Sequence, residues 1–203
     1  SGSGTIVVKS TDGFSSSGTL FINSEQFTYT GKSTTSFTGV TRSANSTSAA
    51  THSANAVVSE TWTVRDTGRT NATKYSFEKF NFDGNDKFIV VDGANDPTVF
   101  NTSLAATDVT ASSVEGAKHV VAFKNHMFYS GMSSTPQEVV FSQPFDEDAF
   151  DSGSGAGSIK IDDTIVGLKV FRDNLFIFCE NRIFQITGSS SSDFAVKPVT
   201  RNI

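Results

Sequence analysis

Short segments in which apolar and polar residues alternate recur along this chain, and a period of two is typical of strands that bury one face. One such segment runs from residue 19 to residue 31. Its apolar alternate positions are Leu20, Ile22, Phe27 and Tyr29. Polar residues 23–25 supply a turn, and further alternating segments lie at 5–10 and 32–40. Residues 1–58 are therefore predicted to form a small Ser/Thr-rich β module.

A second pattern is a repeated phrase. The segments VVAFKNHMFYSG (120–131) and GLKVFRDNLFIFCE (167–180) align when Phe123 is superimposed on Phe171, which lies 48 residues later. Each copy contains a strand, a tight polar turn and a second strand with large apolar residues. A weaker third copy, FDGNDKFIVVDG, has Phe88 near the place of Phe128. The pattern predicts a recurring β-hairpin.

Each hairpin is followed by another predicted strand, at 98–101, 138–143 and 182–187. Units of 40–50 residues with about four strands are typical of β-propeller blades. We therefore expect three propeller-like repeats of antiparallel sheet, at about 59–112, 113–161 and 162–203. Propellers close with roughly four to eight blades. Three repeats thus belong to a longer protein, are completed by another subunit, or form an open array.

Composition strengthens the all-β prediction. The chain has 19 Phe but only 3 Tyr and 1 Trp, and no window shows an apolar stripe at helical spacing. The large number of Phe residues favours aromatic packing between stacked sheets. The residues expected to include such core positions are Phe123, Phe128, Phe171, Phe176 and Phe178.

The net charge and the length of the apolar stretches argue against two classes of protein, those that bind nucleic acid and those that span a membrane by helices. The net charge is −5 and no basic run occurs, so a grip on nucleic acid through phosphate contacts is not expected. No stretch approaches the roughly 20 apolar residues of a membrane-spanning helix. The first four residues, SGSG, are interpreted as a linker or a cut end rather than a signal peptide.

Two oxygen-rich turns are candidate calcium sites. The first contains Asp83, Asn85 and Asp86, and the second contains Asp92, Asn95 and Asp96. The spacing of an EF-hand, with its distal Glu, is missing, and both segments match Asx-turns. The structural interpretation is preferred, no cofactor or metal is expected, and calcium remains the alternative.

The sequence offers no catalytic set. Acidic residues crowd one loop at Asp146, Glu147, Asp148 and Asp151, where solvated charge is preferred over a paired-carboxylate hydrolase site. The three histidines (His52, His119 and His126) form no metal-binding pair, and the glycine-rich segment 153–157 lacks the Lys of a phosphate loop. Cys179 lies in an apolar run and is predicted to be a small buried side chain. We expect the protein not to be an enzyme.

The first 52 residues resemble a short β module of tailed-bacteriophage structural proteins. The positions that carry this resemblance are Phe14, Gly18, Glu25, Tyr29, Gly31, Phe37, Gly39, Arg42, Asn45, Thr47 and His52. The chain departs from the pattern after Arg42, where Ser43 replaces the usual glycine.

The later repeats resemble propeller-like parts of phage tail and neck proteins. The matching positions are Phe123, Phe128, Ser130, Pro136, Phe141, Ser142, Phe150, Ile165, Leu168, Phe171, Leu175, Phe178, Ile183, Ile186 and Gly188. Both resemblances imply a structural component of the virion, in the tail or neck, that assembles with other virion proteins or as a homo-oligomer or ring. The alternative is a carbohydrate-binding adhesin or receptor-binding module, with a glycan as ligand for exposed Trp62, Tyr29, Tyr75 or Tyr129.

Overall fold

The computed structural model describes residues 4–60, 66–70 and 74–201. It confirms the all-β prediction, because these residues form small antiparallel sheets and their only helical segments are two three-residue 3₁₀ turns. The chain divides into two compact units, Ser1–Val64 and Arg65–Ile203. Each unit is described by itself below.

The first unit contains two three-stranded sheets, in the orders β1-β5-β4 and β3-β2-β6. Their strands are β1 (Gly4–Val7), β2 (Gly18–Ile22), β3 (Glu25–Tyr29), β4 (Gly31–Lys32), β5 (Ser36–Val40) and β6 (Val58–Glu60). β6 pairs with β2, so this unit continues a few residues past the expected boundary at 58.

The core of the first unit follows the alternation in its sequence. The buried residues are Leu20, Ile22, Phe27, Tyr29, Phe37 and Val40. Phe37 lies at the centre of an aromatic group, with ring centroids 5.0 Å from Phe14 and 4.8 Å from Tyr29. The β2–β3 turn has Asn23 at φ 55°, a left-handed conformation that Asn tolerates well.

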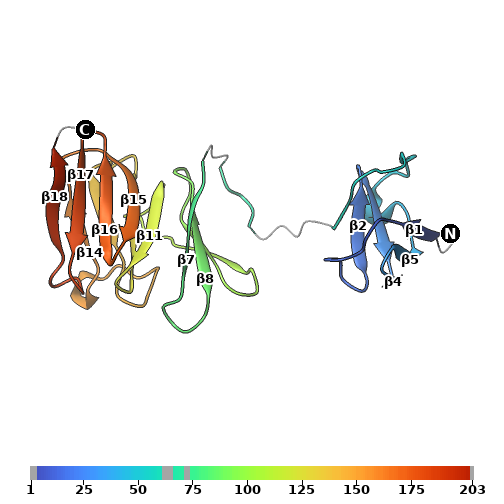
Figure 1. Ribbon diagram of the computed structural model, residues 1–203, viewed down its shortest axis with the longest axis horizontal. Helices are drawn as coiled ribbons and strands as arrows, with labels where there is room; N and C mark the ends of the chain where they lie inside the picture. The colour runs from blue at the N-terminus through green and yellow to red at the C-terminus, as the bar shows by residue number, and fades with distance from the viewer. Residues whose placement is uncertain (1–3, 61–65, 71–73, 202–203) are drawn as a thin grey trace. The chain divides into compact units, whose positions relative to one another are not determined.

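The second unit contains three four-stranded antiparallel sheets, each formed by four consecutive strands (Figure 1). The first sheet contains β7 (Ser76–Phe80), β8 (Lys87–Val91), β9 (Thr98–Phe100) and β10 (Ala106–Asp108). The second contains β11 (His119–Phe123), β12 (His126–Ser130), β13 (Glu138–Phe141) and β14 (Gly157–Lys160). The third contains β15 (Ile165–Phe171), β16 (Asn174–Cys179), β17 (Arg182–Thr187) and β18 (Ala195–Arg201).

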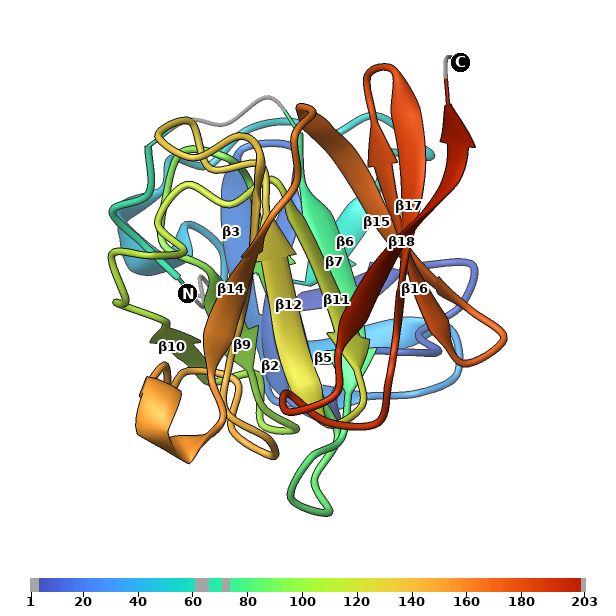
Figure 2. The same cartoon turned by 90° about the vertical axis from the view of Figure 1, so that its left-hand side faces the viewer.

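The sheets of this unit follow one another in sequence order, and their first strands are neighbours. β11 contacts β7 on one side and β15 on the other. Figure 1 shows these three strands in succession, and Figure 2 views the same array from the side of β18. The second sheet is therefore enclosed between the other two.

The two faces of the second sheet bury different sets of residues. Val120, Met127 and Tyr129 pack in the core shared with the first sheet. Val121, Phe123 and Phe128, which alternate with them, pack in the core shared with the third sheet. All five residues of β12 are buried. A strand with both faces covered is typically a continuous run of apolar residues. The strand HMFYS approaches this, with Met127, Phe128 and Tyr129 in succession.

The two clearest hairpin copies have the same two-residue turn. Phe123 pairs with His126 around Lys124-Asn125, and Phe171 pairs with Asn174 around Arg172-Asp173. All four turn residues have positive φ, between 46° and 65°. This is the type I′ geometry that matches the twist of antiparallel strands.

The third copy departs from the expected alignment. Phe80 pairs with Lys87, so residues 81–86 form a six-residue loop instead of a tight turn. In that register Phe88 is equivalent to Met127 and not to Phe128. A slip of one residue reverses the face of a strand, so Phe88 points away from the second sheet, whereas Phe128 points toward the third.

Candidate functional site

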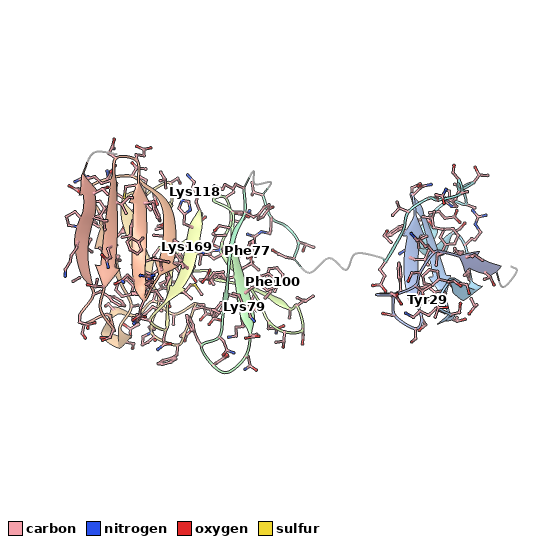
Figure 3. The ribbon with its side chains drawn as sticks, in the orientation of Figure 1. Tyr29, Phe77, Lys79, Phe100, Lys118 and Lys169 are labelled. Atoms are coloured by element: carbon pink, nitrogen blue, oxygen red, sulfur yellow. The ribbon has the colours of Figure 1, made fainter. Side chains whose placement is uncertain are left out.

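The first sheet exposes an apolar face that no described residue of its own unit covers. We call this the leading face and define it by Phe77, Lys79, Phe88, Val90 and Phe100. Phe77 is 72% exposed, and the Phe88 and Phe100 rings stack with centroids 4.8 Å apart. Figure 3 labels Phe77, Lys79 and Phe100 on this sheet. Exposed apolar patches of this kind are typical of interaction sites.

A groove of about 670 Å³ runs over the leading face. Exposed Tyr75 and Leu104 extend its apolar lining beyond the strands. Neither Phe77 nor Phe100 was among the residues predicted from the sequence to be functional. The sequence does contain a signal for a second buried face. The strands SFEKF and KFIVV carry apolar side chains on both faces, as is typical of a sheet that packs on two sides.

The third sheet ends the array with a second exposed face. We call this the trailing face and define it by Lys169, Phe171, Phe176, Phe178, Ile183, Gln185 and Lys197. The prediction that Phe123 and Phe128 are core residues is confirmed. The other three members of the set that was expected to include core positions are less enclosed, since Phe176 is half-buried and Phe171 and Phe178 are 59% and 38% exposed. They occupy interface positions, but no sheet of this unit follows to cover them.

An ion pair joins the hairpin turns of the second and third sheets. Lys124 Nζ lies 2.6 Å from Asp173 Oδ1, and the Lys124 ammonium also lies 5.7 Å from the centre of the Phe123 ring. Arg172, equivalent to Lys124, stacks on Phe171 at 5.4 Å. Among the described residues, no carboxylate forms an ion pair with Arg172.

In the first unit, polar residues of the phage-module pattern converge on one buried carboxylate. Glu25 Oε1 accepts a hydrogen bond from Arg42 Nε at 2.9 Å, and Oε2 lies 2.6 Å from Arg42 Nη2 and 2.8 Å from His52 Nε2. The backbone N–H groups of Ser43 and Ala50 also donate to it. The Arg42 guanidinium, more than offsetting burial, holds the pKa of Glu25 well below its ordinary value.

This arrangement is a structural clamp. Glu25 shares the buried face of β3 with Phe27 and Tyr29, and its partners come from the loop that follows β5. The carboxylate thereby fixes a segment that has almost no regular structure. Both oxygens of the Glu25 carboxylate are engaged by donors from this segment.

The second candidate calcium turn is occupied by protein donors. Burial disfavours the Asp92 carboxylate, but hydrogen bonds from the backbone N–H of Ala94, from Asn95 and from Arg69 lower the pKa of Asp92 to about 2. Arg69 Nη2 lies 2.9 Å from Asp92 Oδ2 and 3.1 Å from the Asp96 carbonyl oxygen. Arg69 was not predicted from the sequence, because it lies in a segment without a periodic pattern.

The first candidate turn is paired in the same way. Asp83 accepts a hydrogen bond from the Asn85 backbone N–H at 3.0 Å and lies 3.1 Å from Lys87 Nζ. Asp86 lies 2.8 Å from Lys79 Nζ. Within the part of the chain that the structure describes, no three His, Cys, Asp or Glu side chains gather so as to hold a metal ion.

The acidic residues of the 146–151 loop make separate contacts and do not form one site. Glu147 pairs with Lys87 at 2.9 Å, and Asp151 caps the 3₁₀ turn Ser152–Ser154. A hydrogen bond with Asp146, followed by burial, raises the pKa of Asp148. The loop thus links the second sheet to the first and closes a local turn.

The remaining reactive side chains are mostly enclosed. His126 is buried, and its Nδ1 lies 2.6 Å from the Ser142 carbonyl oxygen. Its ring lies among those of Phe128, Phe141 and Phe194 in the core between the second and third sheets. Burial raises the pKa of the Cys179 thiol to about 11.

The aromatic side chains named for a sugar site do not form a row. Tyr29 and Tyr129 are buried, with their hydroxyl groups donating to the carbonyl oxygens of Ser15 and Glu147. Tyr75 is exposed, and Trp62 lies outside the described residues. Of the described members of this set, Tyr75 is therefore the one offered to solvent.

No model of a protein family matches the chain, and a search of the curated proteins returns no match. No helix in the described residues is long and apolar enough to span a bilayer. The two exposed sheet faces are thus the candidate functional site.

Proposed function

We propose that this chain is a structural component of a tailed-phage virion, in the tail or neck, and that it acts by assembly with other protein subunits. The observation that carries the proposal is the pair of exposed sheet faces at the two ends of the array. In the second sheet, the equivalent faces are both buried by neighbouring sheets. The end faces have the composition of interfaces and lack their partners.

The stacking of the three sheets supports a propeller-like array. Each sheet has four consecutive strands, and the first strands β7, β11 and β15 lie next to one another. In a propeller the first strands surround the axis, and large side chains fill the space between blades. The ring itself requires more sheets than this chain supplies.

The virion assignment rests on sequence resemblance together with the Glu25 clamp. Glu25, Arg42 and His52 were matched to the phage module by sequence alone, and the structure brings their side chains into contact. These mutual contacts give the three residues of the pattern one shared structural role in this chain. The adhesin has less support, since two of its four candidate aromatic residues are buried.

The test is the composition of the particle. Virions produced from the genome that carries this gene should contain the chain in a fixed ratio to the other tail or neck proteins, as measured by quantitative mass spectrometry. Immunogold labelling should place it on the tail or neck. A chain that is missing from purified virions and binds strongly to a glycan array as a monomer would refute the proposal.

A further inference from the structure

The two end faces are complementary in position. The leading face is equivalent to the face of the second sheet formed by Val120, Met127 and Tyr129, which the first sheet covers. The trailing face is equivalent to the opposite face of the second sheet, formed by Val121, Phe123 and Phe128, which the third sheet covers. Within the described residues of this unit, no sheet precedes the leading face and none follows the trailing face.

From this relationship we propose that two copies of the chain pair head to tail, with the leading face of each copy on the trailing face of the other. The pair contains six sheets, which lies within the roughly four to eight blades of known propellers. Each new interface continues the stacking already present between the sheets of one chain. The inference rests on the proposed function and names a second copy as the partner in assembly.

Charge at the hairpin turns favours this partner. Within the chain, the cationic turn residue Lys124 of one sheet pairs with Asp173 in the turn of the next sheet. Arg172 is the equivalent cation on the third sheet. In a head-to-tail pair, the turn that follows Arg172 is the partner copy's 81–86 loop. Its Asp83 and Asp86 pair with Lys87 and Lys79 of their own sheet but remain half-exposed, so each can also face a second cation.

The same geometry disfavours pairing of like faces. Two trailing faces would bring together Lys169, Lys197 and Arg172 from each copy, and like charges in an interface are repulsive. The head-to-tail arrangement instead places these cations opposite a face that is defined with a single lysine, Lys79, and beside Asp83 and Asp86 of the 81–86 loop. A closed pair also leaves no sheet face exposed for further growth.

Sedimentation velocity of the full chain, with three variants, tests this proposal. The unmodified chain should sediment at roughly twice the 21.7 kDa mass of one copy. Phe77→Glu on the leading face and Phe171→Glu on the trailing face should each raise the dimer dissociation constant at least tenfold. Val57→Glu, at a 79% exposed position of the first unit, is the control and should leave it unchanged.

An equimolar mixture of the Phe77→Glu and Phe171→Glu variants provides the sharpest result. Each mixed pair keeps one interface in which neither face is altered, so a 1:1 heterodimer should form where neither variant dimerises alone. Arg172→Glu should weaken dimerisation by itself and more strongly at low salt. Circular dichroism of each variant checks that the sheets are retained.

Three results would overturn the head-to-tail pair. They are a strictly monomeric unmodified chain, a dimer that Phe171→Glu leaves intact, and a mass that grows beyond two copies with concentration. A monomeric chain that is nevertheless present in virions would refute this pairing and leave the proposed function standing. Absence from virions would refute the proposed function, whatever the mass.

Discussion

Phe123 and Phe171 close the same two-residue hairpin turn in consecutive sheets, yet Phe123 is 4% exposed and Phe171 is 59% exposed. Each ring has a cation from the turn above it, Lys124 or Arg172. The difference comes from what lies opposite, because the third sheet covers Phe123 and no sheet of the unit covers Phe171. The buried environment of Phe123 therefore indicates the kind of sheet surface that would cover Phe171 in an assembly.

This pair gives a matched test of the interface. Phe123→Ala should lower the free energy of unfolding by roughly 3–5 kcal/mol, because it removes a buried ring and leaves a cavity. Phe171→Ala should change it by less than about 1 kcal/mol, since the ring is mostly in solvent. Urea unfolding at a protein concentration low enough to keep the chain monomeric measures both. Equal losses would contradict the conclusion that Phe171 is uncovered in the single chain.

The Glu25 clamp predicts a dependence of stability on pH. Its pKa is depressed in the folded chain, so the stabilisation is present above the ordinary value of 4.5 and is lost as pH falls below it. Glu25→Gln should lower the midpoint temperature of the first unit's unfolding transition, as measured by calorimetry at pH 7. It should also make that temperature less sensitive to pH between 5 and 3.

The control for the clamp is Asp12→Asn, which changes an exposed carboxylate of the same unit. It should leave the transition temperature and its pH dependence nearly unchanged. If Glu25→Gln and Asp12→Asn behaved alike, the clamp would not stabilise this loop.

Ser43 is predicted to carry conformational strain. It has φ 55° and ψ 35°, in the left-handed region, at the position where the phage pattern has glycine. Ser43→Gly should stabilise the first unit by roughly 0.5–1 kcal/mol, because glycine adopts this conformation without a steric penalty. Thermal unfolding measures the gain, and Ser43→Ala should bring none.

Cys179 should be unreactive in the native chain. It is 5% exposed, and burial raises its pKa to about 11, so little thiolate is present at pH 8. Ellman's reagent should label it at least a hundredfold more slowly in buffer than in 6 M guanidinium chloride. Rapid labelling of the folded chain would show that the core between the second and third sheets is open.

Sequence alone predicted much of the second unit, since the repeated Phe and the polar turn residues fix both strand type and spacing. It failed at residues 81–86, where the turn is longer and shifts the register by one residue. It also could not distinguish Phe123 from Phe171. Burial of these identical residues depends on whether another sheet follows, which is a property of the array and not of the local sequence.

The contacts of Glu25 illustrate a second kind of feature that the sequence alone does not predict. Glu25 lies at an alternate position with Phe27 and Tyr29, so the pattern places it on the buried face. Its partners Arg42 and His52 lie 17 and 27 residues away and belong to no periodic segment. Resemblance to the phage module identified these residues together, but only the fold shows that they meet.

Cross-linking of purified virions, followed by mass spectrometry, tests assembly through the end faces most directly. Lys79 on the leading face and Lys169 and Lys197 on the trailing face supply the reactive amines. Because the two end faces meet within the head-to-tail pair, we predict cross-links from Lys79 of one copy to Lys169 or Lys197 of another. Recovery of the chain from virions with cross-links to other subunits only through Lys9 or Lys32 of the first unit would contradict this prediction.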